Sequence, residues 1–370
     1  MSAPFTVLQQ DRGSQARLGR LITAHGEVET PCFMPVGTQG TVKAMLPRDL
    51  REIGCQILLG NTYHLYLRPG HDVIRRLGGL HRFMGWNGPI LTDSGGYQVF
   101  SLGAMRQISE EGVMFQSHLD GARHFLTPEK SVEIQQALGS DIVMVLDECV
   151  SGTAAREYVQ ASVERTVRWA ERCLRGGSAN AQQFIFGIVQ GGVFEDLRRR
   201  CVEALIKMSF DGFAVGGLGV GEDAQQLHQI GAFTAKLLPH DRPRYLMGVG
   251  RPQDIVQAVR AGFDMFDCVI PTRNARNGTL YTFNGKLNIK RAEFAEDPRP
   301  VEEDCGCYAC QSFSRAYLRH LYMAGEILSA QLNTFHNLYF YHRLMDKCRE
   351  AIRNDRAHLW TKLSPVEETA

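Results

Sequence analysis

Short runs of apolar residues recur along most of this 370-residue chain, and longer segments of mixed polarity separate them. Nearly continuous apolar strands are typical of a parallel sheet that is covered on both faces. The pattern therefore predicts one parallel sheet. Its strands are expected at eight runs: Cys32–Pro35, Gln56–Gly60, Pro89–Thr92, Asp141–Leu146, Gln183–Val189, Gly212–Gly216, Arg244–Val249 and Met265–Ile270.

Helical periodicity fills most of the gaps between these runs. In the first such helix Thr127 is suited to the N-cap, Pro128 to the first helical position and Glu129 to the first turn. Eight strand–helix units predict an α/β fold, the (β/α)₈ TIM barrel. An open doubly wound sheet is the main alternative, but no G-x-G-x-x-G motif follows the first strand. The expected helices are Pro128–Leu138, Arg156–Leu174, Glu195–Met208, Asp223–Leu238 and Gln253–Ala261.

The cysteines indicate a metal site. The chain opens without the basic flank and apolar run of a signal peptide, and no apolar stretch is long enough to span a membrane, so we expect a reducing cytoplasm. Clustered cysteines in that compartment more often bind metal than form disulfides. Cys305, Cys307 and Cys310 form Cys-x-Cys-x-x-Cys, and a histidine would complete a closed, structural Zn²⁺ shell. His336 is the first choice for that ligand, with His320 and His342 as alternatives.

Two regions lie outside the repeating pattern. Residues 17–30 alternate as a hairpin does, with His25-Gly26 as its turn. Beyond Thr272 we predict a second hairpin over residues 279–289 that turns at Asn284-Gly285, then helices over 312–324 and 338–354. We therefore divide the chain into a barrel with its N-terminal hairpin (1–272), a hairpin and zinc-binding subdomain (273–345), and a C-terminal helix and tail that complete the barrel (346–370).

Net charge says nothing about a nucleic-acid partner, because 41 Lys and Arg residues balance 40 Asp and Glu residues. Any positive field must therefore be local. The stretch from Pro271 to Ala292 contains no acidic residue, although by itself it is better explained as a solvated loop and hairpin. Its basic residues are Arg273, Arg276, Lys286, Lys290 and Arg291.

Carboxylates follow several of the predicted strands at the end where barrel enzymes carry their chemistry. Asp93 and Asp147 follow the third and fourth strands, Asp264 immediately precedes the eighth, and Asp267 lies within the eighth. One carboxylate as nucleophile and another as proton donor suit glycosidic-bond chemistry. For Asp93 a turn-forming role is as well supported. Because Asp264 and Asp267 are three residues apart, only one can face the mouth, and periodicity does not say which.

These residues resemble the tRNA-guanine transglycosylase family in its bacterial form. The resemblance rests on Thr92 to Gln98 (TDSGGYQ), Asp264 to Cys268 (DMFDC) with Pro271-Thr272-Arg273, and the cysteine cluster through His336. It runs in order from Thr30 to Asn337. It implies a (β/α)₈ barrel with one structural zinc ion per subunit and His336 as the fourth ligand.

The family resemblance also implies residue roles. Asp267 would be the nucleophile that forms a covalent tRNA–aspartyl intermediate, and Asp93 the general acid/base, in a pentosyl transfer with retained configuration. The anticodon loop would meet Arg273 and Arg276, and RNA phosphates Lys286, Lys290 and Arg291. The residues that would bind the base are Asp93, Ser94, Tyr97, Asp147, Gln190, Gly217, Leu218 and Met247.

The substrate implied by the resemblance is the wobble guanine of G-U-N anticodons, in tRNAs for aspartate, asparagine, histidine and tyrosine. In queuosine biosynthesis it would be exchanged for 7-aminomethyl-7-deazaguanine (preQ1). Val220 and Cys149 favour preQ1 over the bulkier queuine, although Gly219 leaves extra room. Family members of this type are homodimers. Phe313, Tyr317 and His320 would share a helical face that suits either core or interface.

Two alternatives belong to other functional classes. A non-catalytic RNA-binding accessory subunit would lack the three aspartates Asp93, Asp147 and Asp267, which are present here. A glycoside or nucleoside hydrolase would share the carboxylates but leave the zinc subdomain and the basic stretch without a role. A transglycosylase that accepts queuine is the nearest variant of the favoured hypothesis.

Overall fold

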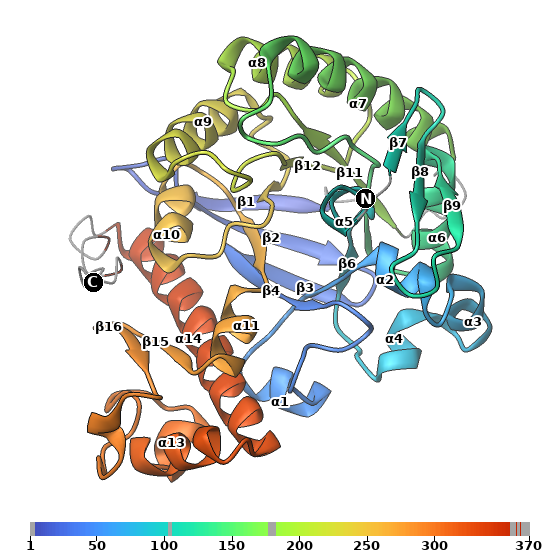
Figure 1. The fold of residues 1–370 in the computed structure, drawn as a ribbon. Coiled ribbons are helices and arrows are strands. Elements are labelled where there is room, and N and C mark those ends of the chain that lie inside the picture. Colours follow the sequence, from blue (N-terminus) through green and yellow to red (C-terminus); the bar gives the residue numbers. More distant parts are fainter. Residues whose placement is uncertain (1–3, 103–105, 177–182, 356–359, 361–362, 364–370) are drawn as a thin grey trace.

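The computed structural model describes residues 4–102, 106–176, 183–355, 360 and 363. Its centre is a closed parallel barrel, which confirms the predicted fold class and all eight strand positions (Figure 1). Pairing of the last strand with the first, Met265 opposite Cys32, rules out an open sheet. The strands are β4 (Cys32–Gly37), β5 (Leu58–Gly60), β6 (Ile90–Thr92), β10 (Ile142–Met144), β11 (Phe184–Val189), β12 (Gly212–Val215), β13 (Arg244–Leu246) and β14 (Met265–Cys268).

Helices cover the outside of the barrel, so the strands are buried on both faces and their sequences are almost entirely apolar. Thr127 caps its helix as predicted, because its side chain accepts a hydrogen bond from the backbone N of Lys130 at 3.1 Å. The main outer helices are α1 (Pro47–Glu52), α6 (Pro128–Leu138), α7 (Arg156–Gly176), α8 (Glu195–Leu205), α9 (Ala224–Leu237) and α10 (Pro252–Arg260). Four short helices were not predicted: α2 (Thr62–Leu67), α3 (His71–Arg76), α4 (Gly79–Met84) and α5 (Gly96–Leu102).

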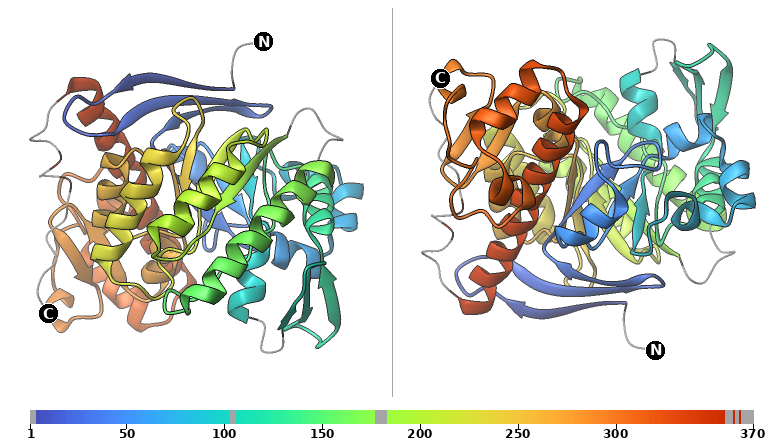
Figure 2. Two further views of the ribbon diagram at one scale, coloured as in Figure 1. Left: turned by 90° about the horizontal axis from the view of Figure 1, so that it is seen from above. Right: turned by 90° about the horizontal axis from the view of Figure 1, so that it is seen from below.

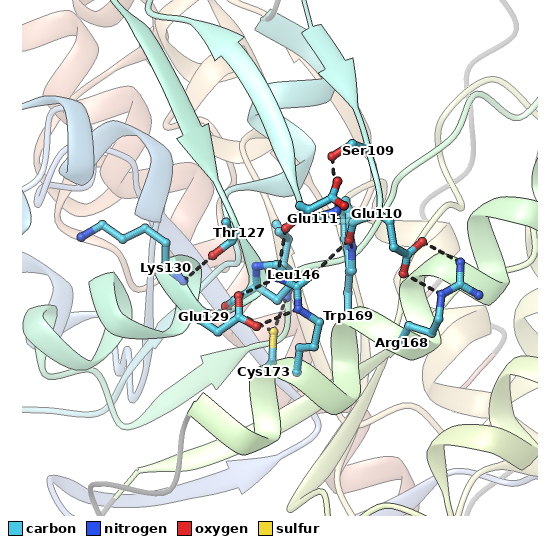
Figure 3. A network of polar contacts seen from close by, with 12 residues as sticks. Ser109, Glu110, Glu111, Thr127, Glu129, Lys130, Leu146, Arg168, Trp169 and Cys173 are labelled. Atoms are coloured by element: carbon cyan, nitrogen blue, oxygen red, sulfur yellow. Dashed lines mark hydrogen bonds and ion pairs between the residues drawn. The ribbon is translucent and has the colours of Figure 1, made fainter.

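A second sheet, also not predicted, lies between α5 and α6. It comprises β7 (Arg106–Ile108), β8 (Val113–Gln116) and β9 (Arg123–Leu126). Helix α7 holds the turn between β7 and β8 through Glu110, as Figure 3 shows. Arg168 forms two hydrogen bonds with the Glu110 carboxylate, at 2.6 and 2.8 Å, and the Trp169 indole N–H donates to the Glu110 carbonyl at 2.8 Å.

The segment beyond the barrel strands consists of α11 (Ile270–Arg276), β15 (Thr279–Thr282), β16 (Gly285–Asn288), the 3₁₀ helix η1 (Ala292–Phe294), α12 (Tyr308–Ser312), α13 (Arg315–Met323) and α14 (Ile327–Asn354). The hairpin forms, but Thr282 pairs with Gly285, so its turn is one residue earlier than predicted. The first basic residues lie on α11 and not in a loop. Helix α14 runs through both the subdomain and the barrel wall, so the predicted division after residue 345 falls inside one helix (Figure 2). Most of the tail beyond residue 355 lies outside the described residues.

The N-terminal hairpin is part of a three-stranded sheet of β1 (Phe5–Gln10), β2 (Arg17–Thr23) and β3 (Gly26–Thr30). Its turn is Ala24-His25, again one residue earlier than predicted, because Thr23 pairs with Gly26. The sheet crosses the end of the barrel at which the strands begin (Figure 2). Among the described residues, no helix is both long and apolar enough to cross a membrane.

A buried ion pair ties this sheet to the barrel. Arg17 in β2 donates to both carboxylate oxygens of Asp264, at 3.0 and 2.6 Å, and both side chains are almost fully buried. Asp264 also accepts a hydrogen bond from the backbone N of Arg244 at 2.7 Å. Asp264 therefore lies at the N-terminal end of the barrel, and its carboxylate is fully occupied by structural contacts.

Replacing this carboxylate tests its structural role. Asp264→Asn leaves the buried Arg17 guanidinium without a charged partner, so we expect the free energy of unfolding to fall by about 3–5 kcal/mol. Denaturant unfolding followed by circular dichroism measures the loss. Asp241→Asn is the matched control, because Asp241 is exposed and its ion pair with Arg242 lies at the surface; we expect a change below about 1 kcal/mol there. Equal effects of the two substitutions would refute a structural role for Asp264.

Candidate active site and metal centre

Two aspartates lie at the opposite, C-terminal end of the barrel. Asp93 directly follows β6, and Asp267 is the third residue of β14. In the barrel β4 and β5 separate these two strands, so the carboxylates approach the mouth from different sides. Because Asp264 is held at the other end, the structure identifies Asp267 as the residue of the pair that faces the mouth.

The Asp93 carboxylate is buried and is held only by neutral donors. It accepts hydrogen bonds from the Asn61 side chain at 2.5 Å, the Thr62 backbone N at 2.8 Å, the Gln98 side chain at 2.9 Å and the Gly95 backbone N at 3.2 Å. Burial raises the pKa of Asp93 to about 6; the hydrogen bonds from Asn61, Thr62 and Gln98 oppose that rise and the charge of Asp267 adds to it. A carboxyl group with such a pKa can both give and take a proton near neutral pH.

Asp267 is held by two donors that fix one of its oxygens. The Tyr245 hydroxyl and the Gly248 backbone N donate to Oδ1 at 2.5 and 2.8 Å. Burial raises the pKa of Asp267, and these two hydrogen bonds oppose the rise. An aligned carboxylate without a cationic partner retains its nucleophilic oxygen.

A third carboxylate, Asp147, is part of a wall suited to the edge of a flat ligand. Its oxygens accept hydrogen bonds from the Ser94 hydroxyl at 3.3 Å and the Gln190 side chain at 2.6 Å. Burial raises the pKa of Asp147 to about 6. The Oε1 atom of Gln190 is buried and has no hydrogen-bond partner among the described residues. Such an acceptor is suited to a ligand donor.

Gly217 completes this wall. Its backbone adopts a positive φ of 64°, and a Cβ at this position would lie 2.3 Å from Gln190 Oε1. Only glycine therefore fits beside the Gln190 amide. Within the described chain, no hydrogen-bond acceptor meets the backbone N–H of Gly217.

Glu148 points away from this wall despite its neighbouring position. It forms an ion pair with Arg165 and accepts a hydrogen bond from the Tyr158 hydroxyl at 2.6 Å, and both partners come from α7. These contacts indicate that Glu148 joins the strand end to the outer helix layer.

The other predicted base-site residues differ in exposure. Leu218 and Cys149 are buried, Met247 and Val220 are partly buried, and Tyr97 is half exposed. Burial raises the pKa of the Cys149 thiol to about 12 and keeps it protonated.

Several residues that hold this site were not predicted from the sequence. Asn61 and Thr62 follow β5 directly, a position that the predicted strand end would have flagged. Arg198 and Tyr245 carry weaker signals, because Arg198 is one of three consecutive arginines in a predicted helix and Tyr245 lies inside a predicted strand. Glu222 accepts hydrogen bonds from the backbone N–H groups of Gly219 and Val220, and so shapes the loop after β12.

The predicted basic residues all lie near the surface of α11 and the hairpin region. Arg273, Lys286, Lys290 and Arg291 are exposed. Arg276 is partly buried and donates to the Thr272 carbonyl at 2.8 Å. The structure thus leaves four of the five cations open to solvent.

Cys305, Cys307, Cys310 and His336 come together in a buried cluster that can hold a metal ion. The three sulfur atoms lie 3.8, 3.5 and 3.3 Å from Nδ1 of His336. Bonds of about 2.3 Å to sulfur and about 2.0 Å to nitrogen place such ligand atoms about 3.6 Å apart around tetrahedral zinc. Nε2 of His336 lies 2.8 Å from the Tyr281 carbonyl, which orients Nδ1 towards the sulfurs. His320 is exposed and His342 lies outside the cluster, so neither alternative is the fourth ligand.

A second group of possible ligands, His25, His81 and Asp141, lies at the N-terminal end of the barrel. The two imidazoles meet different oxygens of Asp141, at 2.8 and 3.1 Å, and their rings stack with centroids 3.6 Å apart. An imidazole binds an ion in its ring plane, and one ion cannot lie in two stacked planes. We interpret this group as a link between the N-terminal sheet and the barrel.

A parallel barrel with paired carboxylates at its mouth defines an enzyme suited to glycosidic bonds. The family model described as "Queuine tRNA-ribosyltransferase" matches residues 11–363. The chain therefore belongs to this family, and it is a tRNA-guanine ribosyltransferase, which is a pentosyltransferase.

Curated relatives cover almost the whole chain. A queuine tRNA-ribosyltransferase of Solidesulfovibrio magneticus is 60% identical over 357 residues, covering 96% of each chain. One of Caldanaerobacter subterraneus subsp. tengcongensis is 57% identical over 352 residues, covering 95% of this chain and 94% of the relative. One of Fusobacterium nucleatum is 53% identical over 358 residues, covering 96% of each.

Proposed function

We propose that this enzyme exchanges the wobble guanine of G-U-N anticodon tRNAs for preQ1 by double displacement, through a covalent tRNA–aspartyl intermediate. The observation that carries the proposal is the pair of carboxylates at the mouth, the buried Asp93 and the partly buried Asp267, which are held by neutral donors at different sides of the barrel. The barrel (1–272), the subdomain (273–345) and the closing segment (346–370) are proposed as units, although α14 joins the last two.

In the first displacement Asp267 attacks the anomeric carbon of the ribose. Tyr245 and Gly248 both donate to Oδ1, so we assign the attack to Oδ2. A carbon–oxygen bond forms while the bond to guanine breaks, and the departing ring nitrogen takes the proton of Asp93. The raised pKa of Asp93, about 6, keeps part of the population protonated for this step.

In the second displacement Asp93 removes the proton from the ring nitrogen of the incoming base. That nitrogen attacks the anomeric carbon from the face that guanine left, and the ester bond to Asp267 breaks. Two inversions give overall retention, as in a retaining glycosidase. The reaction exchanges one N-glycosidic bond for another, so it needs no energy-rich cofactor.

Base recognition is assigned to the wall of Asp147, Gln190 and Gly217. Guanine and preQ1 present one acceptor and two donors along the same edge. The wall offers one unpaired donor, the Gly217 N–H, and two acceptors, the Asp147 carboxylate and Gln190 Oε1. Tyr97 and Met247 would contact the faces of the ring, Ser94 supports Asp147, and the Leu218 carbonyl would meet the aminomethyl group.

Selection of preQ1 over queuine is assigned to Val220 and Cys149. Val220 lies beside the loop glycine Gly219, and its side chain would meet the bulky substituent of queuine. The relatives are named queuine tRNA-ribosyltransferases, so an enzyme that accepts queuine is the alternative.

The RNA-binding surface is assigned to α11 and the neighbouring hairpin. Arg273 and Arg276 lie one turn apart on the helix that follows β14, the strand of Asp267, and so reach the anticodon loop. Lys286, Lys290 and Arg291 would contact phosphates. Arg291 also lies 3.5 Å from Glu293, an exposed and therefore weak pair that RNA can displace.

The metal is assigned as one structural Zn²⁺ per subunit, because four ligands close the shell. We also propose a homodimer. An apolar surface on the same subdomain, here called the subdomain patch, comprises Tyr308, Tyr317, Met323, Ile327 and Leu328, all exposed. Phe313 precedes α13, contrary to the predicted shared helical face, but its ring stacks on Tyr317 at 5.1 Å. Exposed patches of this kind favour self-association.

Base exchange is tested with radiolabelled guanine and unmodified G-U-N tRNA. We expect the wild-type enzyme to place label in the RNA. Asp267→Asn should abolish both incorporation and the denaturant-resistant RNA adduct, because an amide does not form the ester. A control tRNA with a different wobble base should take up no label. Absence of incorporation by the wild type would refute the proposed exchange, and an adduct formed by Asp267→Asn would move the nucleophile to another residue.

Base choice is tested by competition of preQ1 and queuine against labelled guanine. We expect preQ1 to compete at least about tenfold better, the discrimination of roughly 1–3 kcal/mol typical of a steric pocket. Val220→Gly should narrow the difference by opening the pocket. Equal competition by both bases at the wild type would support the queuine-accepting alternative.

Zinc removal tests the metal and the dimer together. Chelation should lower the melting temperature and dissociate the dimer in analytical ultracentrifugation, because the subdomain patch lies on the zinc-stabilised segment. Addition of zinc should restore both. If chelation removed activity while folding, tRNA affinity and mass stayed unchanged, the structural assignment of the metal would be wrong.

A further inference from the structure

Arg198 is a buried cation at the centre of the base-recognition wall. It lies on α8, and its side chain is completely buried. Among the described residues no carboxylate lies within ion-pair distance of it; its partners are backbone carbonyls. Nε donates to Gly192 at 2.9 Å, Nη1 to Val189 and Gly216 at 3.0 and 2.8 Å, and Nη2 to Gly217 at 3.2 Å.

These four carbonyls lie at the strand ends and loops that carry the wall. Val189 is the last residue of β11 and Gly192 lies in the loop after it, on either side of Gln190, and Gly216 and Gly217 follow β12. Burying a guanidinium without a counter-charge is costly unless its donors are satisfied, and here burial lowers the pKa of Arg198 to about 10. Such a group is better explained by what it holds in place than by stability alone.

The contact with Gly216 fixes the direction of the neighbouring N–H. The Gly216 carbonyl and the Gly217 N–H belong to one trans peptide unit, so they point in opposite directions. Because the Gly216 carbonyl points to the Arg198 guanidinium, the Gly217 N–H points away from that guanidinium. This N–H is the unpaired donor of the wall.

We propose that Arg198 is a positioning residue for base selection, which sets the Gly217 N–H and the Gln190 amide in register with the edge of the purine. The proposal rests on the base exchange proposed above. The Gly217 N–H then meets the 6-oxo group, an acceptor that separates guanine from 2,6-diaminopurine. If the Gly217 N–H pointed in another direction, the enzyme would discriminate less between guanine and 2,6-diaminopurine even with its fold intact.

The test compares Arg198→Lys and Arg198→Gln with the wild type. Lys reaches fewer of the four carbonyls, and Gln removes the buried charge while keeping two donors. We expect the KM for guanine to rise at least about tenfold in both, with the KM for tRNA unchanged within about twofold. The concentration of 2,6-diaminopurine that inhibits guanine incorporation should change much less than the KM for guanine does. The preference of the enzyme for guanine over 2,6-diaminopurine should therefore shrink. Arg200→Lys is the matched control, since Arg200 is exposed on the same helix.

The role of Arg198 would be overturned if either variant had a melting temperature near that of the wild type and kept both the KM for guanine and the base preference unchanged. A wild-type enzyme that incorporates no guanine would instead refute the base exchange itself. Should neither variant fold, hydrogen exchange of the wild type decides. Guanine should protect the amides of the peptide that contains Gly217, and absence of that protection overturns the proposal.

Discussion

Closure of the barrel is the constraint on which the rest of the structure depends. When β14 pairs with β4, every strand is buried on both faces, and polar side chains can leave the core only at the two ends. The same register sends Asp264 to one end and Asp267, three residues later, to the other. One pairing thus separates a structural carboxylate from the proposed nucleophile.

The two ends differ in the partners they give to buried carboxylates. At the N-terminal end Asp264 meets the guanidinium of Arg17, and Asp141 meets two imidazoles that help to lower its pKa. At the mouth Asp93 and Asp147 meet only neutral donors, and burial raises their pKa values to about 6. The mouth therefore keeps carboxyl groups that exchange protons near neutrality, whereas the other end neutralises its charges with partners.

The strands, the main helices and the three cysteines of the possible metal site could be predicted because each is encoded by a local pattern: an apolar run, a helical period, or a short cysteine motif. His336 lies 26 residues beyond that motif, and its choice over His320 and His342 needed the family resemblance. The sheet β7–β9 could not, since its short strands alternate weakly and depend on contacts with α7 such as the Glu110–Arg168 pair. The start of α14 was placed at Leu338 instead of Ile327 because its first turns carry both exposed and buried apolar residues. The two hairpin turns were predicted one residue too late in the sequence, because turn chemistry alone does not set the strand register.

In the site, the aspartates could be found from their position after strands, but the choice of Asp267 over Asp264 depends on Arg17, which lies 247 residues from Asp264 in the sequence. Arg198 was not predicted for a similar reason. Its partners are backbone carbonyls, and because every residue has one, the sequence does not show which of them accept hydrogen bonds from a distant side chain.

Helix α14 gives the subdomain that carries the cysteine–histidine cluster an architectural role. The helix carries His336 in its first half and packs on the barrel wall. There the Tyr341 hydroxyl donates a hydrogen bond to the Gly250 carbonyl at 2.5 Å. Helix α14 is also the outer helix that covers the seam between the last strand and the first. The segment that carries the cluster therefore cannot be deleted as a separate module. A deletion that removed the ligand residues would also remove the helix that covers the pairing of β14 with β4, where the barrel closes.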